Sequence, residues 1–151
     1  MTASDSGSDG DPDDGGDAYD YDYDYEVAVD VRLRDVDFMG HVNNATYATY
    51  LEQARDAYFR DVLDVSLVET ETVLVTLEID YVRPIEADSD VVVAIDVAEL
   101  GTSSLPFEYE IRADGKRAAT ARTVQVVRDP ETGESKPLPE KWRSRIEAYR
   151  E

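Results

Sequence analysis

The sequence predicts an α+β fold in which a five-stranded antiparallel sheet packs against one long helix. Apolar residues recur at every second position in five separate segments, which is the pattern of half-buried strands. One segment has apolar residues at spacings of three and four instead, which indicates a helix. The last four strands are joined by short links, and consecutive hairpins of this kind form an antiparallel sheet.

The first strand is predicted at residues 27–33, and the helix follows it at Ala45–Leu63. Asn43 and Asn44 stand just before the helix, where Asn is a favoured N-cap residue. Asp56 and Arg60 are spaced for an i,i+4 ion pair on its polar side. The apolar side is predicted to consist of Tyr47, Leu51, Ala54, Tyr58 and Val62.

Four strands and a short helix complete the predicted fold. The strands are expected at residues 73–81, 91–97, 105–111 and 116–128. Pro106 predicts an edge position or a bulge in the third of these strands. Asp114-Gly115 is a strong signal for a tight hairpin. Residues 129–133 form a turn, and a terminal helix is expected to carry Trp142, Ile146 and Tyr149 on one face.

Composition limits the class of protein. The 151 residues suit one domain, with an acidic disordered tail expected at residues 1–26 and the folded domain at 27–151. No apolar run is long enough for a transmembrane helix, and the first 26 residues lack the basic start and apolar stretch of a signal peptide. We therefore expect a cytoplasmic protein. Cysteine is absent, which excludes disulfides and thiolate metal sites.

The net charge of −20 is extreme. Residues 1–26 hold ten carboxylates and no basic residue, so the remaining 25 acidic and 15 basic residues give the domain a further −10. Only three of the basic residues are Lys. Self-repulsion of such a surface is screened at high salt, where the Debye length at 1 M is about 3 Å. These features predict a halophilic protein, and they argue against nucleic-acid binding because phosphate would be repelled.

The segment before the predicted helix carries the chemistry. Asp35 and Asp37 are two residues apart, so their carboxylates can influence each other's pKa. An EF-hand interpretation fails because the twelfth position is Thr46 rather than Glu, and we predict no metal site. His41, the single histidine, and the helix start follow at once. A carboxylate, an imidazole and free helix N–H groups together suit attack on a thioester carbonyl.

Residues 34–55 read Arg-Asp-Val-Asp-Phe-Met-Gly-His-Val-Asn-Asn-Ala-Thr-Tyr-Ala-Thr-Tyr-Leu-Glu-Gln-Ala-Arg. This stretch resembles the start of the hotdog acyl-CoA thioesterases of the 4-hydroxybenzoyl-CoA thioesterase type, and it is similar to acyl-carrier-protein thioesterases. The resemblance continues at residues 81–84, 100–104 and 137–140, and it covers about residues 27–142. It implies a hotdog fold, in which a sheet wraps around one long helix.

The resemblance also implies roles for individual residues. Asp37 matches the catalytic carboxylate, which acts as nucleophile or general base. Asn44 matches the start of the helix, whose N–H polarises the carbonyl. His41 matches as well, but the carrier-protein enzymes have Asn where this chain has Met39, so a ligand-orienting or loop-shaping role is open beside acid–base catalysis. Asp35 is expected to be a loop-fixing acceptor.

Substrate-binding positions follow from the same resemblance. They are Gly40, Tyr47, Arg83, Ser103 and Ser104. Arg55 has two alternative roles, a coenzyme A phosphate contact or an i,i+3 pair with Glu52.

The implied activity is hydrolysis of an acyl-CoA thioester to free acid and coenzyme A, without a cofactor. The expected assembly is a homodimer or homotetramer with sites at the subunit interface. Two alternatives remain open, namely a hotdog hydratase or dehydratase of enoyl or 3-hydroxyacyl thioesters and a non-catalytic acyl-CoA binding module. Aromatic, short aliphatic and long-chain acyl groups are all compatible with the sequence.

Overall fold

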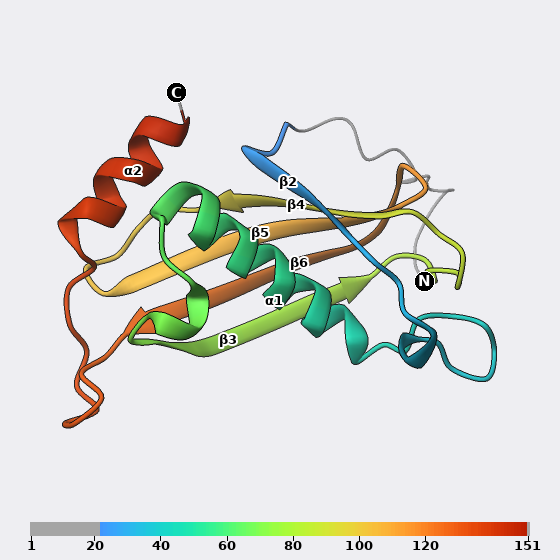
Figure 1. The fold of residues 1–151 in the computed structure, drawn as a ribbon, viewed down its shortest axis with the longest axis horizontal. Helices are drawn as coiled ribbons and strands as arrows, with labels where there is room; N and C mark the ends of the chain where they lie inside the picture. Colours follow the sequence, from blue (N-terminus) through green and yellow to red (C-terminus); the bar gives the residue numbers. More distant parts are fainter. Residues whose placement is uncertain (1–21, 151) are drawn as a thin grey trace.

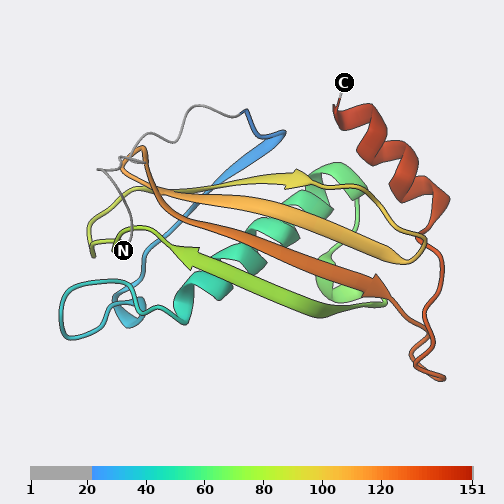
Figure 2. The same cartoon turned by 180° about the vertical axis from the view of Figure 1, so that it is seen from behind.

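The computed structural model describes residues 22–150, and it confirms the α+β fold with its five-stranded antiparallel sheet and one long helix. The strands lie in the order β2-β4-β5-β6-β3, with α1 crossing one face (Figure 1). We call this the inner face; seen from behind, the outer face has no helix across it (Figure 2). The elements are β2 (Tyr25–Val29), α1 (Thr46–Tyr58), β3 (Thr72–Tyr81), β4 (Val91–Val97), β5 (Ser104–Ala113), β6 (Lys116–Val127) and α2 (Glu140–Arg150).

The first strand differs from its prediction at both ends. β2 begins at Tyr25, so Tyr25 and Glu26 belong to the sheet rather than to the tail, whose residues 1–21 lie outside the described residues. The strand ends at Val29, because its last pair with β4 is Val29 with Val91. A single turn of 3-10 helix follows and leaves Leu33 92% exposed. The period-two pattern therefore continues past the end of the partner strand.

The predicted long helix is confirmed. It begins at Thr46, and Phe59–Leu63 continue it as a π-helix that ends at Asp64 with a left-handed φ of 59°. The predicted apolar side is buried at all five positions. The N-cap position of α1 is Ala45 rather than either Asn, and the backbone N–H groups of Ala45 and Thr46 donate to the side chain and carbonyl of Asn43, both at 2.9 Å, in the turn that leads into the helix. The predicted ion pair of Asp56 with Arg60 is present at 2.8 Å.

Strand β3 is an edge strand with an apolar surface. Its apolar residues Val73, Leu74, Val75, Leu77 and Tyr81 are 40–48% exposed. The register with β6 shifts between Leu74 and Thr76, so the alternation predicted for residues 73–81 does not run unbroken. Only Ile79 packs against the core. Exposed apolar edges of this length invite pairing with another strand.

Pro106 was predicted to mark an edge or a bulge, and that prediction is wrong. β5 lies between β4 and β6, and the register is regular at Pro106. The last pair between β4 and β5 is Val97 with Phe107, so Pro106 lies just past the end of β4. There its carbonyl accepts the N–H of Ala98 at 2.9 Å, and Arg150 donates to the carbonyl of Ala98 at 3.1 Å. A proline fits because the ladder has ended on that side.

The C-terminal predictions hold. Asp114 and Gly115 have φ values of 54° and 81°, as a tight hairpin between β5 and β6 requires. In α2, Ile146 is buried and the Trp142 ring packs edge-on against Phe59 at 5.5 Å. No helix of the described residues combines the length and hydropathy needed to cross a bilayer.

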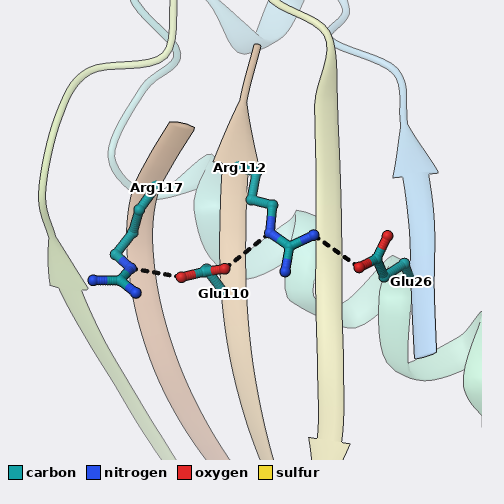
Figure 3. Close-up of polar contacts among 4 residues, drawn as sticks. All are labelled: Glu26, Glu110, Arg112 and Arg117. Atoms are coloured by element: carbon teal, nitrogen blue, oxygen red, sulfur yellow. Dashed lines mark hydrogen bonds and ion pairs between the residues drawn. The ribbon is translucent and has the colours of Figure 1, made fainter. Parts of the chain in front are cut away.

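The outer face contains a buried charge network (Figure 3). The carboxylate of Glu110 on β5 accepts bonds from Arg112 at 2.8 Å and from Arg117 at 2.5 Å, and only 1% of its side chain is exposed. Arg112 also reaches Glu26 on β2 at 2.8 Å. The network therefore ties the edge strand β2 and the hairpin strand β6 to the centre of the sheet.

Glu110→Gln is expected to lower the free energy of unfolding by about 3 kcal/mol, because two arginines would share a buried site without its carboxylate. Glu108 provides the control, since it lies on the same strand and face but is exposed. Glu108→Gln removes the same charge and should change stability by less than about 0.5 kcal/mol. Chemical denaturation of both variants measures the difference; equal values would contradict a special role of the network.

Candidate active site

The candidate site is built on the loop between β2 and α1. The loop folds back on itself at residues 37–41. The N–H of Asp37 donates to the carbonyl of His41 at 2.8 Å, and the N–H of Gly40 donates to the carbonyl of Asp37 at 3.0 Å. Gly40 has φ +82°, a conformation that glycine adopts without strain. This turn holds the Asp37 side chain in a defined position ahead of the helix.

The two carboxylate oxygens of Asp37 have different surroundings. Oδ1 accepts the backbone N–H of Met39 at 2.9 Å and that of His41 at 3.2 Å. Within residues 22–150, no donor lies at hydrogen-bond distance from Oδ2. The side chain is partly exposed. Oδ1 thus shapes the turn, and Oδ2 is available to a water molecule or a substrate.

Asp35 is a loop-fixing acceptor, as predicted. Its Oδ2 accepts the N–H of Arg32 and the hydroxyl of Tyr50, both at 2.8 Å. Its carbonyl accepts the N–H of Asn43 at 2.7 Å. Burial, together with the bond to Asp35, raises the pKa of Tyr50 well above its ordinary value. A neutral tyrosine therefore anchors the loop to α1 across the working pH range.

The start of α1 presents a free donor. No acceptor in the described chain lies at hydrogen-bond distance from the backbone N–H of Asn44. The carbonyl of Asn44 is held by the hydroxyl of Tyr81 at 2.8 Å, which attaches the helix start to the end of β3. Free N–H groups at a helix N-terminus stabilise a negatively charged oxygen.

His41 lies on the same loop, but its imidazole faces Glu86. Nε2 is 3.4 Å from a carboxylate oxygen of Glu86, and the two residues form an isolated β-bridge. Glu86 was not among the predicted site residues. Nothing in the local pattern of residues 85–87 points to it, because the contact depends on tertiary pairing across 45 positions.

Tyr47 and Arg83 contact each other near the start of α1. Tyr47 is buried, its ring stacks edge-on against Tyr81 at 4.8 Å, and burial raises the pKa of its hydroxyl. Its hydroxyl approaches the carbonyl of Arg83 at 3.5 Å. The Arg83 guanidinium donates through Nε to the carbonyl of Arg117 at 2.9 Å. Both residues therefore lie at the same end of the sheet as Asp37.

Ser103 and Ser104 lie at the other end. Ser104 pairs with Val126, whereas Tyr81 beside the helix start pairs with Ala119. The ten residues of β5 separate the two ends by roughly 30 Å at about 3.3 Å per residue. One chain therefore does not bring Ser103 and Ser104 to Asp37.

The ion pair predicted between Arg55 and Glu52 is wrong, and the coenzyme A phosphate contact stays a prediction. The residue is 4% exposed, on the side of α1 that faces the sheet, and its Nη1 donates to the hydroxyl of Tyr109 at 3.2 Å. It makes no ion pair with Glu52 among the described residues. The sequence misled because an arginine in an amphipathic helix is usually on the polar side.

The described residues contain no group of carboxylates and histidine suited to hold a metal ion. Ahead of the helix, Asp37 Oδ2 and the backbone N–H of Asn44 both lack a hydrogen-bond partner among the described residues, and they are seven positions apart. The pair suits chemistry in which a base or nucleophile attacks a carbonyl carbon while a donor receives the oxygen's growing charge.

Comparisons with known proteins point the same way. A family model of the thioesterase-like superfamily matches residues 31–146. A thioesterase from Thermus thermophilus, solved with coenzyme A and Zn, is 41% identical, with 84% of this chain and 94% of that chain covered at a TM-score of 0.77. A predicted thioesterase from Bacillus stearothermophilus is 28% identical, with 83% and 95% covered at a TM-score of 0.75. An uncharacterised protein of Bacillus subtilis (strain 168) is 29% identical over 107 residues, 70% of this chain and 73% of that protein.

Proposed function

The chain belongs to the thioesterase-like superfamily and has the hotdog fold, and from that premise we propose that it hydrolyses an acyl-CoA thioester to the free acid and coenzyme A. The observation that carries the proposal is the pair of unpartnered groups on one loop, Asp37 Oδ2 and the N–H of Asn44. Coenzyme A bound to the related Thermus protein supports the choice of thiol.

In the proposed reaction, Asp37 Oδ2 either attacks the thioester carbon or takes a proton from the attacking water. The carbonyl oxygen gains negative charge, and the Asn44 N–H with the positive end of the α1 dipole stabilises it. The carbon–sulfur bond breaks and coenzyme A leaves as the thiol. The free acid is released, directly or after water opens the acyl-aspartyl anhydride. No cofactor takes part in these steps.

His41 has an accessory place in this proposal. Its imidazole faces Glu86, while its backbone N–H and carbonyl close the turn around Asp37. This favours a loop-shaping role over acid–base work. Gly40 and Tyr47 would shape the entrance beside the helix start, and Arg83 would lie at its edge.

We further propose that the working unit is a homodimer formed through β3. Its edge is unpaired and apolar, as described above, and antiparallel pairing with a second copy would bury it. Such a pairing places the Thr72 end of one β3 beside the Tyr81 end of the other. The loop with Ser103 and Ser104 would then approach the Asp37 loop of the partner, which would account for their separation within one chain.

A thiol-release assay tests the proposed function. The purified protein is offered a panel of acyl-CoA thioesters with aromatic, short and long acyl groups, in buffer of high salt because the acidic chain is proposed to work in a salt-rich cytoplasm. Release of free thiol from at least one member is the expected result. Hydration of an enoyl-CoA without thiol release would favour the hydratase alternative, and tight binding without turnover would favour a binding module.

A further inference from the structure

Arg55 is a buried cation without a counter-ion. Only 4% of Arg55 is exposed to solvent. Among the described residues, its single hydrogen bond is to the neutral hydroxyl of Tyr109. Within residues 22–150, its Nε has no acceptor. A guanidinium cannot escape the cost by losing its proton, since arginine is not deprotonated in proteins. An uncompensated buried charge is strongly destabilising, so something outside the described chain should neutralise it.

Glu52 carries the opposite charge to Arg55 and is exposed rather than buried. It lies on α1 one turn before Arg55, is exposed, and takes part in no ion pair within the described chain. Its side chain lines a surface hollow of about 330 Å³ together with Asp56, Leu67 and Val68. Arg55 instead points beneath the helix toward Tyr109, so the two charges of one chain stay apart although they are neighbours on the helix.

The Arg55 guanidinium contacts the central strand β5, and one strand, β6, separates β5 from the exposed edge strand β3. The hydroxyl groups of Tyr109 and of Thr123 on β6 are hydrogen-bonded at 2.5 Å. Thr123 in turn is the register partner of Leu77 on β3. Leu77 is 42% exposed. A chain of direct contacts through Tyr109 and Thr123 therefore links Arg55 to the apolar edge strand that the proposed dimer would cover, two strands away.

Hydrogen bonds connect both ends of α1 to segments at the two ends of β3. The start of α1 is fixed to the end of β3 by the bond from Tyr81 to Asn44. Near its other end, Asp56 accepts the N–H of Leu67, whose segment leads into the start of β3. Glu52 is midway along α1, so it lies level with the middle of β3. A two-fold axis between the two paired β3 strands, beside the middle of each, would turn the midpoints of the two α1 helices toward each other.

We propose that in a two-fold dimer Glu52 of each subunit pairs with the partner subunit's Arg55. An interface of this symmetry uses the same patch on both copies, so a patch with one free anion and one free cation is complementary to itself. The pairing occurs twice and neutralises both buried guanidinium groups. This inference rests on the β3 dimer of the proposed function, but not on the reaction.

Complementary single variants test the pairing. Glu52→Lys alone places two like charges together at each of the two contacts of a homodimer, and so does Arg55→Glu alone. Mixed with each other, one chain of each kind brings opposite charges together at both contacts, because the introduced Lys meets the introduced Glu at one contact and the native Glu meets the native Arg at the other. We expect each variant alone to be monomeric and the mixture, co-expressed with two different tags, to form one-to-one heterodimers in native mass spectrometry. An ion pair within one chain would gain nothing from mixing.

A milder variant covers the case in which Arg55→Glu does not fold. Glu52 is exposed in the single chain, so Glu52→Gln leaves the subunit intact, and we expect the dimer dissociation constant to rise roughly 100-fold or more because two buried pairs are lost. Glu147→Gln on α2 removes an equal charge from an exposed position and should leave the constant unchanged.

Two results would overturn the pairing: a Glu52→Gln dimer as tight as the wild type, or folded Glu52→Lys and Arg55→Glu chains that do not associate on mixing. Sedimentation needs no substrate, so these outcomes are independent of thiol release. An active wild-type chain that stays monomeric at every concentration would remove the dimer and the pairing but leave the proposed reaction in place.

Discussion

Asp37→Asn is expected to lower the rate of thiol release from acyl-CoA by about 10³-fold, which lies within the range that a positioned base contributes. The amide replaces Oδ2, the oxygen without a partner, by a group that can neither attack a carbonyl nor accept a proton from water. The loss should appear in kcat, because the acyl-CoA contacts of the neighbouring residues stay in place. Steady-state kinetics with the best substrate of the panel measures it.

The same variant preserves the turn, which makes it a clean test. Asparagine keeps an oxygen that can accept the N–H groups of Met39 and His41, so the circular dichroism spectrum and unfolding midpoint should match the wild type. Asp37→Ala removes that acceptor as well and should cost both activity and stability. A folded Asp37→Asn protein with wild-type kcat would reject Asp37 as the catalytic carboxylate.

Leu77→Arg is expected to dissociate the proposed dimer and, with it, most of the activity. Leu77 lies in the middle of the unpaired edge strand and is half-exposed in the single subunit, so the subunit itself should accept the larger polar side chain. In the dimer the new charge would be buried without a partner. A cost of about 4 kcal/mol corresponds to a rise of roughly 10³-fold in the dissociation constant. Sedimentation over a dilution series measures this constant.

Ala28→Arg supplies the matched control at the opposite edge of the sheet. Ala28 is exposed on β2, so the introduced charge remains in solvent and the dimer should persist. If Leu77→Arg keeps the wild-type mass while Ala28→Arg changes it, β2 rather than β3 would be the contact edge. Activity that survives in a Leu77→Arg monomer would show that one chain holds a complete site.

The sequence predicted the parts of the fold that depend on local periodicity. Five strands, the long helix and the Asp114-Gly115 hairpin were all placed, because alternation, helical spacing and turn preference act within a few residues. The end of β2 and the place of Pro106 were wrong, since each depends on where β4 stops. The extent of pairing along β2 and β5 depends on the ends of β4, so the sequences of β2 and β5 alone do not show it.

In the candidate site, too, the residues with local contacts could be predicted, and those that meet only through the tertiary fold could not. Asp35 as a loop anchor could be predicted because its bonds to Arg32 and Asn43 are local. Glu86 could not be, since it meets His41 only after the sheet forms. Arg55 misled most, because the spacing of charges on a helix does not reveal which of them the sheet covers. The catalytic assignments of Asp37 and Asn44 stay predictions until the variants are measured.

The order of the strands has a consequence for how the chain is made. β4, β5 and β6 follow one another and pair as neighbours, so they can associate as soon as they are synthesised. β2 must wait, because Tyr25 pairs with Ile95, and at about 5–20 residues per second the delay is several seconds. Throughout that time β2 follows directly on the most acidic part of the chain. The like charges of residues 1–26 oppose association between chains during that time, because their repulsion does not depend on a folded surface.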